Sequence, residues 1–419
     1  MLISARTMLH YGAEEYPALL PTLTTPGFTA HRHHRQAPLC PSNPRLILCE
    51  IPQKSSAAVP HREISGTCYH TTSLRAALLV LAASAAAVSA APGLSLKVSG
   101  PEAVDGVENL KVVTTLTNTG DETLKLLNDP RSVLHSLPAN TFAITTDDGA
   151  SPSFTGVKVK YSPSRAAKST SPSAFTVLAP GESVSLTHDL SSAYNFTLPG
   201  AGKYTVEASN LFHYVDANSE IAEIRADAEA HVAAVSGKLA VVRPTPTLTK
   251  REQYNGCSSS EKSGINSAAP AAQSYVAAAL SYLQTHTAST ARYTTWFGSY
   301  TSSRHSTVES HYSNINSHDY TSFTYDCTCD DSGTYAYVYP DDFGTIYLCG
   351  AFWDAPNTGT DSRAGTLVHE ASHFTVNGGT DDHVYGQSAA KSLAKSNPTE
   401  AIDNADNHEY FAENNPAQS

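Results

Sequence analysis

Charged residues are scarce in this sequence, and basic ones are especially few in its C-terminal part. Only 16% of the 419 residues are Asp, Glu, Lys or Arg. From Gln253 to the end there are six Lys/Arg against eighteen Asp/Glu, whereas the preceding part carries 21 of each sign. An acidic half of this kind repels nucleic acids and anionic membranes and favours cationic ligands. We therefore expect no nucleic-acid or membrane partner. Nothing in the sequence indicates an oligomer, so we expect a monomer.

The Ala/Leu/Val-rich stretch at Ser73–Gly93 is too short and too rich in alanine to cross a membrane. Within it, the basic residue Arg75 precedes the apolar core, and Val88-Ser89-Ala90 follows the core before Ala91, which is the layout of a signal peptide with its cleavage site. We therefore predict a signal peptide at residues 71–90 and a secreted, extracellular product. Residues 1–70 are rich in Pro and His without hydrophobic periodicity, and we interpret them as an unstructured leader from an extended gene model.

Residues 91–252 are predicted to form a β-sandwich-like region. Short alternating runs separated by Gly, Pro, Asn and Asp are typical of antiparallel strands; they are LSLKVSG, LKVVTTLTNTG, FAITTDDG, VSLTHDL, GKYTVEASN and KLAVVRP. Asn195 begins a glycosylation sequon, which has meaning only in a secreted chain. The Pro/Thr-rich linker Pro244–Cys257 contains the dibasic pair Lys250-Arg251, and extended linkers are protease targets. We therefore predict a removable pro-region, with a plain interdomain linker as the alternative.

Residues 253–419 are predicted to form a mainly helical α+β domain with a small antiparallel sheet. Helical spacing recurs at residues 267–286, 303–318, 361–375 and 397–415, and TYAYVYPDDFGTIYLCG predicts a hairpin. Four of the seven cysteines fall in this part and predict two disulfides. Cys327 and Cys329 are too close for an easy mutual bridge, so each should pair outward, one with Cys257 and one with Cys349.

The stretch His369-Glu370-x-x-His373 predicts a zinc site on a helix. Histidines at i and i+4 share one helix face and can reach one metal ion. Glu370, beside them, can take a proton from a zinc-bound water and pass it to a leaving amine.

The third protein ligand remains open at this point. The metzincin continuation needs Gly and His where the sequence has Val376 and Gly379, which excludes that class. A glutamate from a later helix is a second solution, and a local residue presented by the turn NGGT is a third; the candidates are Glu400, Glu409, Asp381, Asp382 and His383. Spacing alone does not choose among them.

The stretch HEASHF…GGTDDHVYG resembles the aspzincins, the deuterolysin-type zinc endopeptidases marked by HExxH and GTxxDxxYG. The resemblance implies a zincin-like catalytic domain with one Zn²⁺ per chain, held by His369, His373 and Asp382. It also implies Glu370 as general base and Tyr385 as a donor that stabilises the oxyanion, a role that suits a phenol. Asp381 and His383 would then be bystanders.

Stretches throughout Gln253–Ser419, among them YNGCSSSEKS and NADNHEYFAENNPAQ, resemble the lysine-specific aspzincins of basidiomycete fungi. The resemblance implies a zymogen whose mature form cleaves on the amino side of lysine through zinc-activated water. It assigns lysine recognition to Asp406 and Glu409, an i, i+3 pair that concentrates negative charge on one helix face. It also implies the disulfides Cys257–Cys327 and Cys329–Cys349. The alternatives are a broad-specificity deuterolysin without lysine preference and a non-enzymatic binding module.

Overall fold

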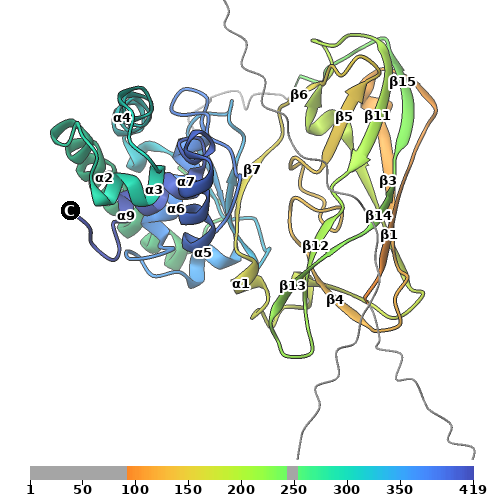
Figure 1. Ribbon diagram of the computed structural model, residues 1–419, viewed down its shortest axis with the longest axis horizontal. Coiled ribbons are helices and arrows are strands. Elements are labelled where there is room, and N and C mark those ends of the chain that lie inside the picture. Colours follow the sequence, from red (N-terminus) through yellow and green to blue (C-terminus); the bar gives the residue numbers. More distant parts are fainter. Residues whose placement is uncertain (1–91, 243–252) are drawn as a thin grey trace, which may run out of the picture. The chain divides into compact units, whose positions relative to one another are not determined.

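The computed structural model describes residues 92–242 and 253–419, shown in Figure 1. The first range is built mostly of strands and the second mostly of helices, as predicted. Within these ranges no helix combines the length and the apolar character that a membrane span requires. The predicted leader, signal peptide and dibasic pair lie outside the described residues.

The strand-rich region contains three four-stranded sheets and a two-stranded pair. The sheet orders are β14-β1-β3-β9, β2-β15-β11-β5 and β13-β12-β4-β8, with β10 paired to β6. The bounds are β1 Leu94–Ser99, β2 Ala103–Asp105, β3 Lys111–Asn118, β4 Leu124–Leu127, β5 Phe142–Thr146, β6 Ser153–Phe154, β8 Phe175–Leu178, β9 Ser183–Asp189, β10 Tyr194–Asn195, β11 Gly202–Ala208, β12 Leu211–Val215, β13 Ile221–Arg225, β14 Asp227–Glu229 and β15 His231–Ser236. A short helix, α1, spans Pro163–Ala166.

Alternate residues of these strands meet in one apolar core, as in a β-sandwich. Leu94, Leu96 and Val98 of β1 share this core with Tyr204 and Val206 of β11. Five of the six predicted strands are present. The sixth, at residues 238–244, is wrong over 238–242, because the chain turns at Gly237 (φ +69°) and has no regular structure there.

The helical region contains eight α-helices among its described residues. They are α2 Ser259–Thr285, α3 Ala291–Phe297, α4 Ser302–Asn316, α5 Gly350–Asp354, α6 Arg363–His373, α7 Gln387–Ser396, α8 Pro398–Ala401 and α9 Ala405–Glu413. Long helix α2 begins with a capping box, in which Ser258 accepts from the Glu261 N–H and the Glu261 carboxylate accepts from the Ser258 N–H. Helices α2, α6 and α9 pack together around the apolar core of this region (Figure 1).

The single helix predicted at residues 397–415 is wrong, because the structure divides it into α8 and α9. The break falls at residues 402–404. The side-chain oxygen of Asn404 accepts hydrogen bonds from the N–H groups of His383 and Val384, at 2.9 and 3.1 Å. Asn404 therefore fixes the segment that follows the NGGT turn instead of continuing a helix.

One five-stranded sheet accompanies the helices, in the order β16-β17-β19-β18-β7. Its strands are β16 Tyr254–Asn255, β17 Thr324–Asp326, β18 Thr334–Val338, β19 Thr345–Leu348 and β7 Lys158–Tyr161. The predicted hairpin is present as antiparallel β18 and β19. The prediction of a purely antiparallel sheet is wrong, since β17 runs parallel to both β16 and β19. The fifth strand, β7, comes from the strand-rich region and pairs antiparallel with β18.

Two disulfides hold the strands of this sheet. The structure contains Cys257–Cys327 and Cys329–Cys349, the pairing that the resemblance implies. They link the segments that flank β16, β17, β18 and β19. Asn195 lies in β10 and is half-buried, with its side-chain oxygen accepting from the Thr197 N–H at 2.9 Å. Its glycosylation stays a prediction.

Candidate metal centre and acidic pocket

Helix α6 is buried from Ala364 to His373 and is held at its start by α9. Ser362 caps the helix, its hydroxyl accepting from the Gly365 N–H at 2.9 Å. The Glu413 carboxylate of α9 accepts from the Ser362 N–H at 2.9 Å and from its hydroxyl at 2.8 Å. A Cβ atom at Gly365 would lie 2.1 Å from Glu413 Oε1, so only glycine permits this approach. The two helices that carry HExxH and the acidic pair are thereby fixed side by side.

The turn after α6 brings the chain back to the same helix. The Gly379 N–H donates to the Phe374 carbonyl at 3.2 Å, and Gly379 adopts φ +59°, a left-handed conformation that suits glycine. The Thr380 carbonyl then accepts a hydrogen bond from His373 Nδ1 at 2.8 Å. The Thr380 hydroxyl lies 2.7 Å from the Ser372 hydroxyl. This turn places the next residues, Asp381 and Asp382, beside the HExxH motif.

His369, His373 and Asp382 converge in the interior. The Nε2 atoms of the two histidines lie 3.2 and 3.4 Å from Asp382 Oδ1. These three atoms are buried and have no hydrogen-bond partner of good geometry. Since His373 Nδ1–H donates to a carbonyl, its Nε2 carries a lone pair. Buried lone pairs that face one another need a cation, and two imidazoles with a carboxylate suit zinc.

The ionisable groups of this cluster influence one another strongly. Although burial raises the pKa of the Asp382 carboxyl, the neighbouring His373 and His369 hold it well below its usual range. Glu370 is also fully buried, and neither of its carboxylate oxygens has a hydrogen-bond partner. Burial raises the pKa of Glu370 to about 8, against the lowering effect of His369. A carboxyl group that titrates near neutrality suits proton transfer.

The second nitrogen of His369 faces the acidic pair of α9. Its Nδ1 lies 2.9 Å from Asp406 Oδ1 and 3.4 Å from Glu409 Oε2. The other oxygen of Asp406 accepts from the Gly386 N–H at 2.6 Å. A carboxylate at this nitrogen fixes the proton on Nδ1 and directs Nε2 toward the cluster.

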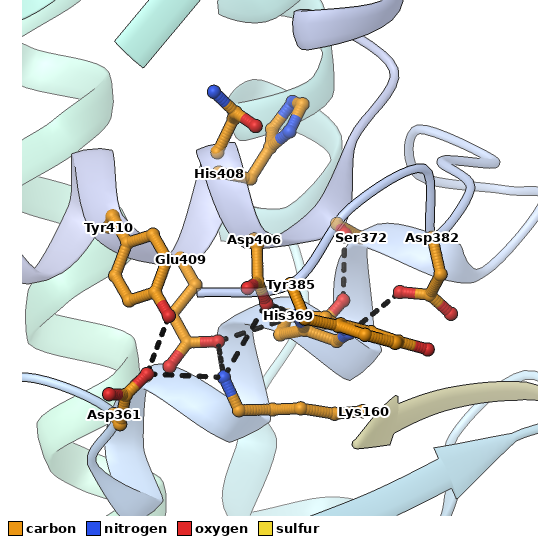
Figure 2. Close-up of polar contacts among 12 residues, drawn as sticks. Lys160, Asp361, His369, Ser372, Asp382, Tyr385, Asp406, His408, Glu409 and Tyr410 are labelled. Atoms are coloured by element: carbon orange, nitrogen blue, oxygen red, sulfur yellow. Dashed lines mark hydrogen bonds and ion pairs between the residues drawn. The ribbon is translucent and has the colours of Figure 1, made fainter. Parts of the chain in front are cut away.

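Asp406 and Glu409 also form a pocket that holds an ammonium group from β7. Figure 2 shows Lys160 reaching Glu409, with which it forms an ion pair, while its Nζ lies 3.6 Å from Asp406 Oδ1 and 3.9 Å from Asp361 Oδ1. Burial lowers the pKa of the Lys160 ammonium, but Glu409, Asp406 and Asp361 together raise it well above its usual value. A buried charge of this kind is stable only among such partners.

Aromatic rings complete this acidic pocket. The Lys160 ammonium lies 5.1 Å from the ring centre of Tyr335 and 5.7 Å from that of Tyr410. The Tyr410 hydroxyl donates to Asp361 Oδ1 at 2.6 Å, which holds that carboxylate at the pocket (Figure 2). Rings and carboxylates in this arrangement favour a cation on an apolar stem.

Tyr385 lies beside the same strand. Its hydroxyl donates to the Val159 carbonyl, and the Arg131 guanidinium stacks 4.2 Å from its ring centre. Burial raises the pKa of Tyr385 well above its usual value, so the group remains a phenol and a hydrogen-bond donor. The Val159 N–H donates to Asp382 Oδ2 at 3.0 Å.

Of the five candidates for a third ligand, the structure brings Asp382 to the two histidine Nε2 atoms. Asp381 and His383 form ion pairs with other side chains. Glu400 is exposed, and Glu409 lies at the Nδ1 side of His369.

Sequence reasoning missed three residues of the site: Lys160, Asp361 and Arg131. Asp361 entered only as the first residue of a predicted helix. Lys158 and Lys160 alternate with Val157 and Val159, which is a strand signal, but nothing local shows that the strand joins a distant sheet.

Comparisons with known proteins show which family the chain resembles. A family model described as "Lysine-specific metallo-endopeptidase", the aspzincin model, matches residues 282–413. A peptidyl-Lys metalloendopeptidase of Grifola frondosa is 69% identical over 82% of this chain and 99% of its own length. One from Armillaria mellea is 60% identical over 82% of this chain and 97% of its own length. A solved zinc peptidase from Grifola frondosa is 72% identical over 39% of this chain and 100% of that one, with a TM-score of 0.39.

The family model includes the HExxH helix and the turn that follows it, and each of the two peptidyl-Lys metalloendopeptidases aligns with 82% of this chain. The chain is a zinc metalloendopeptidase acting on peptide or protein substrates. It belongs to the aspzincin family.

Proposed function

We propose that this chain is made as a secreted zymogen whose mature part, residues 253–419, hydrolyses peptide bonds on the amino side of lysine. The observation that supports lysine specificity is the pocket of Asp361, Asp406 and Glu409, which already surrounds a lysine ammonium. Because the pocket adjoins His369, a lysine held there has its backbone beside the three proposed zinc ligands.

The donor atoms of His369, His373 and Asp382 lie within 4.8 Å of one another and fit one zinc ion per chain. A bound zinc would supply Lewis-acid polarisation of the scissile carbonyl and a lowered pKa of the attacking water. Its positive charge would also favour the ionised form of Glu370, against the effect of burial.

Protein side chains supply the proton transfer, the stabilisation of the oxyanion and the binding of lysine. The Glu370 carboxylate accepts the proton of the attacking water and delivers it to the amine of the departing lysine residue. The Tyr385 hydroxyl donates a hydrogen bond to the carbonyl oxygen on which negative charge develops. Asp406 holds the His369 ring in its orientation, and with Glu409 and Asp361 it binds the lysine side chain.

Secretion and processing have two supports. Two disulfides indicate an oxidising compartment, and an Ala/Leu/Val-rich stretch with a cleavage signature precedes the strand-rich region. The linker with Lys250-Arg251 separates that region from the proposed mature enzyme. N-terminal sequencing of the secreted product should give a start near Gln253, and light scattering should give the mass of one mature chain.

The test of specificity is mass spectrometry of a denatured protein of known sequence after digestion with the mature product. We expect cuts confined to the bond before lysine and abolished by a zinc chelator. Chelator-sensitive cuts at many residue types would instead favour the broad-specificity deuterolysin. Absence of cleavage after verified removal of residues 92–242 would contradict the enzymatic proposal.

A further inference from the structure

Strand β7 lies in the site as an extended peptide. It pairs antiparallel with β18, with Val159 opposite Tyr337 and Lys160 opposite Ala336. Pairing of this kind aligns a peptide by its main chain, while pockets for alternate side chains select its residues. The side chain selected here is that of Lys160.

The contacts of Val159 and Lys160 coincide with those that a lysine-directed substrate would make. Lys160 occupies the acidic pocket with only 3% of its side chain exposed. The carbonyl just before it, that of Val159, accepts from the Tyr385 hydroxyl. The Val159–Lys160 peptide bond therefore occupies the position of the bond before a bound lysine, next to the proposed zinc ligands.

The residues on both sides of this bond are held by contacts within the chain, which a substrate peptide would lack. Val157, Val159 and Tyr161 are each 2% exposed and pack in one apolar cluster with Leu127 and Ala166. On one side, Lys158 Nζ lies 2.5 Å from Asp381 Oδ1. On the other, the Ser162 N–H donates to the Gly333 carbonyl at 3.3 Å just before α1 begins.

We infer that β7 is a substrate-like inhibitor built into the precursor, with Lys160 as its anchor in the lysine pocket. The strand-rich region thus blocks the protease by occupying the place of a lysine peptide, and displacement of β7 is the step that activates it. Cutting the linker alone leaves the enzyme blocked, because β7 lies far from residues 243–252 in the chain. The inference rests on the proposed lysine pocket.

The test uses the full chain carrying Glu370→Gln, so that bound peptides are not turned over. A fluorescein-labelled peptide containing one lysine is titrated against this protein and against the same protein with Lys160→Met, which keeps the stem and removes the charge. Loss of one partner from a buried ion pair should weaken β7 docking, so we expect peptide affinity to rise on the order of a hundredfold. Lys168→Met, at an exposed lysine just beyond α1, should leave the affinity unchanged.

A second measurement covers the case in which the substitution alters folding. The Glu370→Gln chain is cut with a processing protease specific for Lys-Arg pairs and passed over a gel-filtration column, after a thermal melt has verified that it is folded. The two fragments should elute together, whereas those carrying Lys160→Met should separate at low micromolar concentration. Equal peptide affinity, or equal co-elution, of the two proteins would overturn the inference.

Assays of the mature enzyme distinguish a failure of this inference from a failure of the proposed function. If purified residues 253–419 cut before lysine while Lys160→Met changes nothing in the precursor, only the inhibitory role of β7 is wrong. If the mature enzyme shows no lysine preference, the pocket assignment itself is wrong.

Discussion

His369 and Asp406 are in direct contact, with Nδ1 of the imidazole 2.9 Å from Oδ1 of the carboxylate. The same Oδ1 lies 3.6 Å from the Lys160 ammonium. One carboxylate therefore belongs both to the surroundings of the proposed zinc ligand and to the lysine pocket. In the proposed function, metal binding and substrate selection are linked through this carboxylate, so the two roles need separate variants to be told apart.

Asp406→Asn should affect both functions. Loss of the carboxylate at His369 Nδ1 weakens the orientation of the ring, and such changes lower metal affinity roughly 10- to 100-fold. Competition with a fluorescent chelator measures the zinc affinity, and digestion of mixed peptides measures the lysine preference. Asp403→Asn, whose half-exposed carboxylate pairs with His383 and with none of the proposed ligands, is the matched control. Unchanged zinc affinity in Asp406→Asn would contradict the linkage.

Asp361→Asn should affect substrate selection alone. Asp361 Oδ1 lies 3.9 Å from the lysine ammonium, and this side chain is 43% exposed, so its attraction is moderate. We expect kcat/KM for lysine peptides to fall roughly five- to tenfold with zinc affinity unchanged. Asparagine tolerates the left-handed backbone at this position (φ +50°), so the fold should be kept. A fall in zinc affinity would show that the residue acts outside the pocket.

Tyr385→Phe should lower kcat of the mature enzyme about 10²- to 10³-fold and leave KM nearly unchanged. The reason is that the phenol donates to the Val159 carbonyl beside the proposed zinc ligands, in the position where charge develops on a substrate carbonyl. Steady-state kinetics on a lysine peptide give both constants. Tyr335→Phe, which removes the hydroxyl of a ring that lies near the Lys160 ammonium, is the comparison. A main effect on KM would assign Tyr385 to ground-state binding instead.

Removal of zinc should lower the thermal midpoint of the mature enzyme. Without a cation, buried acceptor atoms of His369, His373 and Asp382 face one another, and a ligand that binds only the folded state stabilises it. Scanning calorimetry with and without chelator measures the difference, and added zinc should restore the original midpoint. A midpoint insensitive to chelator would argue against a metal bound in this interior.

The two disulfides should contribute unequally to stability. Cys257–Cys327 closes a sequence separation of 70 residues and Cys329–Cys349 one of 20. In the chain-entropy view the shorter loop contributes about 3 kcal/mol and the longer about 1 kcal/mol more. Urea unfolding of the mature enzyme with each pair changed to serine would test the order. A larger loss from the shorter loop would indicate strain or residual structure in the unfolded chain.

The sequence predicted those parts of the site that local spacing determines. His369 and His373 share a face because they are one helical turn apart, and the glycines that follow predicted a turn that could return Asp381, Asp382 or His383. Resemblance, and not spacing, singled out Asp382 among five candidates. The break between α8 and α9 escaped prediction because Asn404 hydrogen-bonds to a segment twenty residues away. Lys160 was missed for the same reason, because its partners are even more distant, some 200 to 250 residues further along the chain.

The place of β7 at the edge of the sheet has a consequence for what the enzyme can attack. When β7 is gone, β18 is left with backbone N–H and C=O groups open along one side. A helix cannot pair with such an edge, because its own backbone groups are already bonded internally. On the proposed specificity, lysines in helices and in the interior of folded targets are then protected until that stretch of the target opens. The rate at which a folded protein is cut would report the free energy of its local opening, with lysine only marking where the cut falls.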